Sequence, residues 1–384
     1  MKRKICVVVT ARPSYSRIRT ALHAIKADPD LELQLVAAAS TLLDRYGNAF
    51  KYMEQDGFTI ASKVHMVVEG ENLVTMAKTT GLGLLELATA FDNLNPDIVV
   101  TIADRYETIA TAIAASYMNI PLAHIQGGEI TGTIDEKVRH AVTKLADFHL
   151  VSTKKAAENV IRMGEDPSSV FITGCPSIDI AASVLNNPHI DFDPFAKYKG
   201  VGEVFDLRTD YLVVMQHPVT TEHERARTQV METLQAVHEI GLPTFWFWPN
   251  VDAGSDGTSR GIRQFRELKH PTNIHFFKNM EPEDFLRLVY NSRCLVGNSS
   301  VGIREASFLG VPTVNIGTRE AGRERGMNVL DVDYEKGQIK SAIQKQISNG
   351  RFPSDTLYGN GGAGHQIANI LRDIPLKFEK RLTY

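Results

Sequence analysis

The sequence has few cysteines, little net charge and no long apolar run. Its 384 residues include only three cysteines, Cys6, Cys175 and Cys294, which lie far apart and lack the spacing of metal ligands. An odd number of cysteines argues against the disulfide framework of a secreted protein. The formal net charge of -3 gives no reason to expect nucleic acid or an anionic membrane as a partner. The composition therefore predicts neither a metal site nor a disulfide-stabilised fold.

Signals for membrane insertion and export are also missing from the sequence. No apolar run is long enough to span a bilayer. The apolar run Val7-Val8-Val9 gives way at once to Thr10, which is too early for the apolar core of a signal peptide. Hydrophobic residues make up 43% and charged residues 23% of the chain, as in ordinary globular proteins. We therefore predict a cytoplasmic protein with no membrane partner.

Short apolar runs rich in β-branched residues alternate with helical patterns along the chain. This alternation predicts an α/β fold with parallel sheets that are covered on both faces. The pattern breaks over residues 187–209, which are polar and contain prolines, so we expect a linker there. It would join two Rossmann-like domains, 1–186 and 210–384, with the last helix packing back on the first domain. The carboxyl ends of both sheets would then face one interdomain cleft.

The segment from His124 to His140 carries the densest set of chemical groups. Gly127 and Gly128 follow a predicted strand at 122–125, and the helix predicted over 135–146 begins with acids and then carries Arg139. Acids, a cation and an imidazole at a strand-to-helix corner suit proton transfer on a polar substrate. Glu129, Asp135 and Arg139 are the candidates here. The alternative is a charged helix start that Thr133 or Asp135 caps.

Two other strands of the first half end in polar residues. After the first strand come Arg12, Pro13 and Ser16, where a cation and hydroxyls before a helix predicted over 16–27 suit an anionic group. Alternatively, these residues only form a proline-containing turn that caps the N-terminus of the helix. Asp104 and Arg105 follow the strand predicted at 98–102. A helix-capping role would explain Asp104 but not Arg105.

The second half repeats this arrangement. His217 follows a strand at 211–215 and Asn250 follows one at 244–248, although a single histidine in a loop is often merely solvated. Gly297-Asn298-Ser299-Ser300 leads into a helix predicted over 301–309, whose N-terminus would bind a phosphate. Glu305 lies one turn further on and is suited to a ribose diol, and Arg319 follows the next strand. There is no GxGxxG and no Walker A motif, which argues against a dinucleotide or P-loop site.

Taken in order, these motifs resemble the hydrolysing UDP-N-acetylglucosamine 2-epimerases of sialic acid and legionaminic acid synthesis. The resemblance covers nearly the whole chain, and the collinear set is far more specific than any one motif. It includes the segments Tyr46-Gly47-Asn48, Asp104-Arg105, Gly127-Gly128-Glu129, Gly132-Thr133-Ile134-Asp135, Arg139-His140, Gly174-Cys175-Pro176-Ser177, His217-Pro218, Gly297-Asn298-Ser299-Ser300 and Gly317-Thr318-Arg319. It implies the two-domain glycosyltransferase-B-like fold.

The resemblance implies a two-step reaction without metal or redox cofactor. A base removes the C2 proton, UDP leaves from C1, and water adds to the glycal to release N-acetylmannosamine. The residues implied or proposed for catalysis are Asp104, Glu129, Asp135, Arg139 and His217. Those for binding UDP and sugar are Arg12, Ser16, Arg105, Gln126, His217, Asn250, Ser299, Ser300, Glu305 and Arg319. We also expect a homo-oligomer, either a dimer or a tetramer.

Two departures from the family pattern lie near the expected sugar pocket. Many relatives have glutamate where this chain has Gln126, and their first loop often continues with an acid where this chain has Arg12-Pro13-Ser14. Glutamine cannot exchange a proton. The alternatives are therefore the same reaction on a UDP-2,4-diacetamido-trideoxyhexose, a non-hydrolysing epimerase, a glycosyltransferase of this fold, or a nucleotide-sugar sensor without chemistry.

Overall fold

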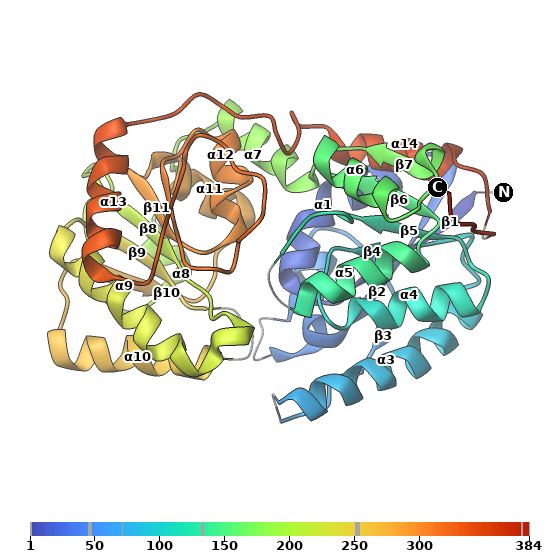
Figure 1. The fold of residues 1–384 in the computed structure, drawn as a ribbon, viewed down its shortest axis with the longest axis horizontal. Coiled ribbons are helices and arrows are strands. Elements are labelled where there is room, and N and C mark those ends of the chain that lie inside the picture. The colour runs from blue at the N-terminus through green and yellow to red at the C-terminus, as the bar shows by residue number, and fades with distance from the viewer. Residues whose placement is uncertain are drawn as a thin grey trace. The chain divides into compact units, whose positions relative to one another are not determined.

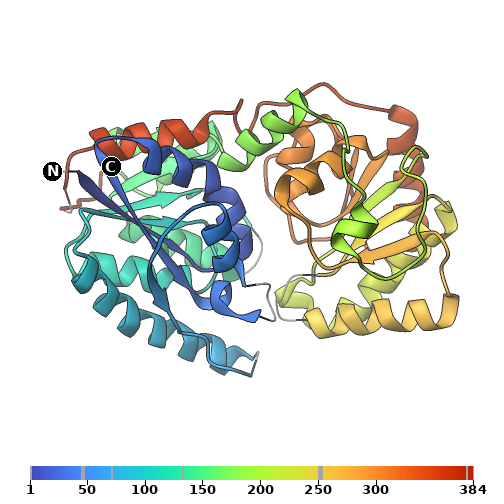
Figure 2. The same cartoon turned by 180° about the vertical axis from the view of Figure 1, so that it is seen from behind.

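The chain forms two compact units in a computed structural model that describes residues 2–44, 48–70, 72–131, 134–249, 254–377 and 379–383. Unit 1 comprises Met1–Ile130, Ile134–Asp179 and Tyr358–Tyr384, and unit 2 comprises Thr131–Thr133 and Ile180–Leu357. Each unit is built around its own parallel sheet (Figures 1 and 2). No helix of the described residues is long and apolar enough to cross a membrane.

In unit 1, strands and helices alternate from the start of the chain. Its elements are β1 (Arg3–Val9), α1 (Arg12–Ala27), β2 (Leu31–Ala38), η1 (Ala39–Leu42), α2 (Ala49–Gln55), β3 (Ile60–Val64), α3 (Leu73–Leu94), β4 (Ile98–Ile102), α4 (Thr108–Tyr117), β5 (Leu122–Ile125), α5 (Ile134–Leu145), β6 (Phe148–Val151), α6 (Lys154–Arg162), η3 (Pro167–Ser169), β7 (Val170–Ile172), α7 (Pro176–Asn186, which continues into unit 2) and α14 (Ala363–Asp373).

The unit 1 sheet has apolar side chains on both faces. Within the described residues its seven strands are parallel in the order β3-β2-β1-β4-β5-β6-β7. Successive β1 side chains point to opposite faces, so Val7 packs under α1 and α14 while Val8 packs under α3, α4 and α5. Two buried faces explain why the strands read as continuous apolar runs.

Unit 2 repeats the architecture with a smaller sheet. Its elements are α8 (Pro194–Tyr198), β8 (Leu212–Met215), η4 (Thr220–Arg225), α9 (Ala226–Ile240), β9 (Thr244–Phe247), α10 (Ser255–Lys269), β10 (Ile274–Phe277), α11 (Pro282–Asn291), β11 (Cys294–Gly297), η5 (Ser300–Gly302), α12 (Glu305–Phe308), β12 (Thr313–Ile316), β13 (Val329–Val332) and α13 (Lys336–Asn349). The described strands are parallel in the order β10-β9-β8-β11-β12-β13.

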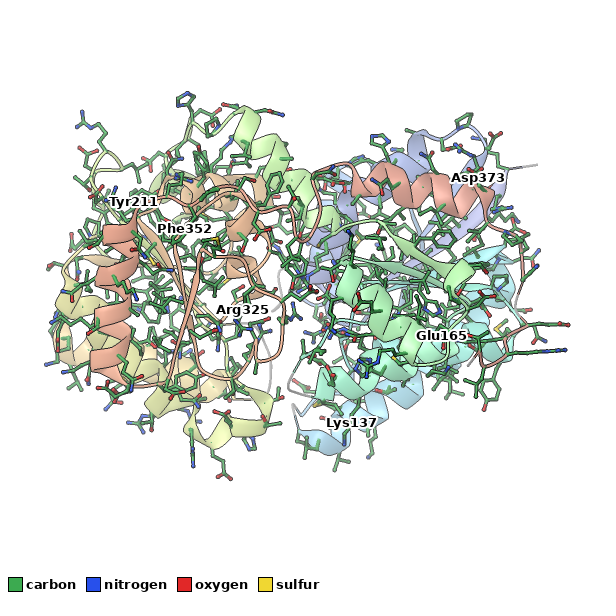
Figure 3. All side chains as sticks on the ribbon, turned by 45° about the horizontal axis from the view of Figure 1, so that its top comes forward. Lys137, Glu165, Tyr211, Arg325, Phe352 and Asp373 are labelled. Atoms are coloured by element: carbon green, nitrogen blue, oxygen red, sulfur yellow. The ribbon has the colours of Figure 1, made fainter. Side chains whose placement is uncertain are left out.

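Residues 187–209 differ from the linker that the sequence predicts. They include α8, and the Phe195 ring stacks on Phe245 of the unit 2 sheet with 5.7 Å between ring centroids. Tyr211, labelled in Figure 3, packs edge-on against the same Phe245 ring. Val201 pairs with Phe276 through a backbone bridge. The aromatic residues in this polar stretch therefore make it part of the unit 2 core, because burying large rings stabilises a fold strongly.

Several expected element boundaries are also corrected. Helix α1 begins at Arg12, not at Ser16, because Pro13 is compatible with the first turn of a helix. The helix expected over 301–309 is a short 3₁₀ turn, η5, followed by the four-residue α12. The sequence pattern did not reveal α2, β3, α7, α8 or β13. The last helix, α14, packs against α1, which assigns the end of the chain to unit 1.

Candidate active site

The polar residues singled out in the sequence gather at one edge of each sheet. In unit 1 they follow β1, β4 and β5, which are neighbours in the sheet. In unit 2 they follow β8, β11 and β12, which are likewise neighbours. The carboxyl ends of adjacent parallel strands lie side by side, and α/β enzymes bind their ligands there. Each unit therefore carries one cluster, described separately below.

Arg139 connects the acids of the unit 1 cluster. It projects from α5 and is 1% exposed. Its guanidinium forms an ion pair with the carboxylate of Asp104, and its Nη1 donates a hydrogen bond of 2.9 Å to the backbone oxygen of Glu129. Glu136, one helical turn before Arg139, lies 3.9 Å away. A buried cation that holds a carboxylate favours the ionised form of that carboxylate, which is the form that accepts a proton.

His124 fixes the backbone immediately before Asp104. This β5 side chain is fully buried, and burial is the main cause that lowers its pKa to about 3. The neutral ring has one N–H, which Nε2 donates to the Ala103 backbone oxygen at 2.9 Å, while Nδ1 accepts from the Thr143 hydroxyl at 3.1 Å. Ala103 has a φ of 59°, an unfavourable conformation for alanine. His124 therefore holds the strained backbone immediately before Asp104.

Gln126 has a similarly unusual backbone at the end of β5. Its φ is 65°, its side chain is 1% exposed, and its Nε2 lies 2.9 Å from the sulfur of Cys175. Cys175 Sγ in turn lies 3.0 Å from the Ser177 hydroxyl. No described residue hydrogen-bonds to the buried Oε1 of Gln126. A buried amide oxygen without a partner is costly, so this atom is suited to accept a donor from a ligand.

The two glycines after Gln126 are required by close packing. A Cβ on Gly127 would lie 2.9 Å from Nδ1 of His124, and one on Gly128 would lie 2.3 Å from the backbone oxygen of Ala156. Gly128 also has a φ of 75°. Any side chain would therefore push the loop away from α6 and move Glu129, which is buried beside the Asp104–Arg139 pair.

The other unit 1 candidates lie around this cluster. Asp135 is half-buried in the first turn of α5. Arg12 and Ser16 are half-buried on α1, and the Arg12 guanidinium lies 4.5 Å from the centroid of the Tyr52 ring. Arg105 forms an ion pair with the buried Glu107 at 2.8 Å. Because α4 begins at Thr108 with Glu107 in the capping position, the alternative role of Asp104 as a helix cap is excluded.

Asn298 organises the unit 2 cluster. It follows β11, is fully buried, and accepts from the backbone N–H of His217 at 2.7 Å while donating to the His217 carbonyl at 2.8 Å. Arg319, which follows β12, donates to the Asn298 backbone oxygen at 3.1 Å. His217 and Arg319 are thus brought together through Asn298. Asn298 belongs to the sequence motif Gly297-Asn298-Ser299-Ser300, but the motif alone did not indicate this role.

Ser299 and Ser300 lie in the turn after β11. The Ser299 hydroxyl accepts from the N–H of Val301, and Ser300 begins η5. The expected long helix behind this turn is absent, because Arg304 interrupts it and α12 has only four residues. The turn therefore offers individual N–H and O–H donors and lacks the macrodipole of a long helix. Glu305, the first residue of α12, is buried, and no described residue hydrogen-bonds to its Oε2.

Charges beside Arg319 are arranged as a buried network. Arg319 Nη1 lies 2.8 Å from Glu320 Oε1, and Arg323 Nε lies 2.9 Å from Glu320 Oε2. Glu320 is 2% exposed, so it fixes both guanidinium groups at the end of β12. Two positioned guanidinium groups suit an anionic ligand such as a diphosphate.

Some expected positions lie outside the described residues. They are the UDP-binding candidate Asn250, the proposed cap Thr133 with Gly132, and the motif residues Tyr46 and Gly47. Among described residues, His124, Cys175 and Asn298 have roles that the sequence motifs did not predict. One signal was present: a histidine near the end of one apolar strand and an asparagine directly after another, where a buried polar side chain needs a specific partner.

The chain is similar to known proteins over most of its length. A family model described as UDP-N-acetylglucosamine 2-epimerase matches residues 23–372. A UDP-N,N'-diacetylbacillosamine 2-epimerase (hydrolyzing) of Legionella pneumophila is 31% identical, with 98% of this chain and 97% of that protein covered. A UDP-N-acetylglucosamine 2-epimerase of Neisseria meningitidis is 30% identical, with 94% and 92% covered.

A solved structure supports the fold. The crystal structure of UDP-GlcNAc 2-epimerase from Neisseria meningitidis bound to UDP-GlcNAc superimposes with a TM-score of 0.78 at 16% identity, covering 96% of this chain and 99% of that one. The two parallel sheets are thus those of the glycosyltransferase-B-like fold of that structure. With the family model matching nearly its whole length, this chain belongs to the UDP-N-acetylglucosamine 2-epimerase family of enzymes.

Proposed function

We propose that the protein is a hydrolysing 2-epimerase that converts UDP-N-acetylglucosamine into UDP and N-acetylmannosamine. The observation that carries this proposal is the Asp104–Arg139 pair next to Glu129 at the strand ends of unit 1. It provides an ionised carboxylate in a largely buried setting, as abstraction of a weakly acidic C2 proton requires. Family membership and relatives that act on UDP-sugars support the same substrate class.

In this proposal unit 2 binds the nucleotide. Arg319 and His217 converge through Asn298, and the donors of Ser299 and Ser300 lie on the neighbouring strand end. These cations and donors would stabilise the negative charge that develops on the diphosphate as it leaves. The Glu305 carboxylate, whose Oε2 has no hydrogen-bond partner among described residues, would accept hydrogen bonds from the ribose hydroxyls.

Unit 1 carries out the proton transfers in this proposal. Asp104 takes the C2 proton, and loss of that proton with departure of UDP from C1 leaves a 2-acetamidoglucal. Water then adds across the double bond, with its oxygen bonding to C1 and a proton to C2. Asp135 and Glu129 accept the proton that the water loses and supply the proton that C2 gains. Arg12, Ser16 and Arg105 of unit 1 would also contact the substrate. Gln126 orients the sugar and exchanges no proton.

The same reaction on a UDP-2,4-diacetamido-trideoxyhexose is the second candidate. It is favoured by the Legionella pneumophila relative, which is named as a UDP-N,N'-diacetylbacillosamine 2-epimerase. The buried Oε1 of Gln126 would accept a hydrogen bond from the substrate at this position. An additional acetamido group carries an N–H donor, which is what this oxygen lacks. A substrate with a hydroxyl at the same carbon would also supply a donor, so the two substrates must be compared directly.

Proton NMR in D2O tests the proposal. UDP-N-acetylglucosamine is incubated with the enzyme, and we expect free UDP with N-acetylmannosamine that carries deuterium at C2. Accumulation of UDP-N-acetylmannosamine would indicate a non-hydrolysing epimerase. A nucleotide-sugar that stays intact until an acceptor is added would indicate a glycosyltransferase, and one that binds without turnover a sensor. The same assay with the diacetamido substrate gives a second value of kcat/KM. The substrate with the higher kcat/KM decides between the two candidates.

A further inference from the structure

The C-terminal segment after α14 lies against the end of α5. Lys380 Nζ donates to three backbone oxygens there, those of Thr143 at 3.1 Å, Lys144 at 2.8 Å and Ala146 at 2.6 Å. Further along, the N–H of Thr383 donates to the Gly164 oxygen at 3.1 Å. The last carbonyls of a helix have no partner within the helix. A cation at this end also interacts favourably with the partial negative charge of the helix dipole. Lys380 therefore caps the C-terminus of α5.

A buried carboxylate holds Lys380 in this position. Glu165 Oε2 lies 2.6 Å from Lys380 Nζ, and Glu165 is also bound by Lys144 at 2.5 Å and by His149 at 3.0 Å. Glu165, labelled in Figure 3, is 1% exposed. Burial opposes its ionisation, but hydrogen bonds from His149, Lys144 and Lys380 outweigh burial and lower its pKa to about 2. The capping ammonium group thus has a fixed, ionised partner.

Helix α5 transmits this anchoring to the unit 1 cluster. It has twelve residues and is about 18 Å long at 1.5 Å per residue. Arg139, in its middle, pairs with Asp104. The backbone oxygen of Thr143 accepts a hydrogen bond from Lys380, and its hydroxyl donates one to Nδ1 of His124. His124 in turn donates to the backbone oxygen of the strained Ala103, which precedes Asp104. Two independent routes therefore connect the end of α5 with the same carboxylate.

We propose that Lys380 is a positioning residue for the reaction: by capping α5 it sets the placement of Arg139 and Thr143, and through them the placement of Asp104. The inference rests on the proposed function, since Asp104 is the base assigned there. It gives the C-terminal segment a role in proton abstraction although the described residues of this segment contribute no group to the site itself.

Lys380→Met tests the proposal, because it keeps most of the apolar stem and removes the donors and the charge. We expect kcat for UDP release to fall roughly 10- to 100-fold, the scale of a small misplacement of a catalytic group. KM and the UDP dissociation constant from calorimetry should stay within about two-fold, because we assign the nucleotide to unit 2. Lys380→Arg should recover most of kcat. Lys377→Met, an exposed lysine of the same segment, is the matched control and should behave as wild type.

A spectroscopic readout separates this proposal from the proposed function. The Nε2 proton of His124, bonded to the Ala103 oxygen, should give a slowly exchanging imidazole N–H resonance in wild type that shifts or broadens in Lys380→Met and returns in Lys380→Arg. Failure of the wild-type protein to release UDP would overturn the function but leave this readout intact. An unchanged resonance, an unchanged kcat, or an equal loss of kcat and UDP affinity would each overturn the role of Lys380. Should Lys380→Met not fold, Lys380→Gln is measured in the same way.

Discussion

At the scale of single residues, buried polar side chains determine where the reactive groups point. Arg139, His124 and Asn298 are all buried, and each hydrogen-bonds to a neighbouring backbone or carboxylate group. Leaving any of these groups unpaired would cost roughly 1–3 kcal/mol, so the partners fix one arrangement. These residues are expected to act through placement, while Asp104 and Asp135 are expected to meet the substrate.

Removing the charge of Asp104 or Asp135 should slow proton transfer strongly and spare nucleotide binding. We expect Asp104→Asn and Asp135→Asn to lower kcat at least ~100-fold, the usual scale of general base catalysis. UDP affinity by calorimetry should stay near wild type, and C2 deuterium exchange should fall in step with UDP release. Asp92→Asn, an exposed aspartate on α3, is the control. If both variants kept turnover within a few-fold of wild type, Glu129 and His217 would become the next pair to examine.

Acid should destabilise unit 1 through His124. Burial lowers the pKa of His124 from 6.5 to about 3, so its imidazole binds a proton more readily in the unfolded chain than in the folded one. The stabilisation from the neutral ring is therefore complete above pH 6.5 and is lost as pH falls from there towards 3. His124 alone should account for about 1.4 kcal/mol of lost unfolding free energy between pH near 7.5 and near 5.5.

The comparison of His124→Asn with wild type isolates this contribution. In urea denaturation, unit 1 of the variant should lose less stability on acidification than unit 1 of wild type. The exposed His65→Asn serves as control and should follow wild type. Parallel pH curves for wild type and His124→Asn would show that the imidazole is not neutral and buried in solution.

At the scale of elements, many of the site residues lie in short irregular turns at strand ends, whereas the regular helices mainly pack against the sheets. Gly297 shows why: its φ is 134°, and a Cβ there would lie 2.1 Å from the Met215 oxygen, so β11 must end in glycine for the turn to reach Asn298. Ala103 and Gln126 adopt positive φ without that freedom. Such strain is maintained only where the surroundings fix the backbone, and it concentrates at functional sites.

Two of these turns should provide the nucleotide affinity. Ser300→Ala combined with Arg319→Ala removes a hydroxyl from one strand end and a guanidinium from the next. We expect UDP binding to weaken by a few kcal/mol, on the order of charge-assisted hydrogen bonds. The matched control is Ser259→Ala with Arg260→Ala, the same residue types on α10. Unchanged UDP affinity in a folded double variant would contradict the assignment of the diphosphate to unit 2.

At the scale of the whole molecule, the chain has two cores and returns to the first of them at its end. Ile367 and Leu371 of α14 are fully buried against the α1 face of unit 1. Ile343 of α13 is fully buried in the unit 2 core. Each core is large enough to unfold as its own cooperative unit, as separate domains generally do.

Matched core substitutions in the two units should therefore act on different transitions. Ile367→Ala and Ile343→Ala each remove the same buried atoms, which should cost about 2–5 kcal/mol. By calorimetry, Ile367→Ala should lower the melting temperature of one transition and Ile343→Ala that of the other. Added UDP should raise the transition that Ile343→Ala lowers. A shift of both transitions by either variant would show that the units unfold together.

The sequence alone determined the fold class and the positions of the chemical groups. Apolar runs alternating with helical patterns suffice for parallel sheets, because a strand covered on both faces must be apolar throughout. Strands β4 and β5 have the bounds that the pattern predicts, 98–102 and 122–125. Asp104 and Arg319 could be recognised because a charge directly after such a run must lie at the edge of a sheet.

Only the tertiary structure decided what these groups contact. That Arg139 pairs with Asp104, that Asn298 holds His217, and that Lys380 contacts the end of α5 depend on residues far apart in the sequence. The sequence pattern also predicted a linker at residues 187–209, because most of these residues are polar and the few aromatic rings that pack on the unit 2 sheet do not stand out among them. Local periodicity reports which face of an element is buried, whereas long-range pairing depends on which buried polar group finds which partner, and no local pattern encodes that choice.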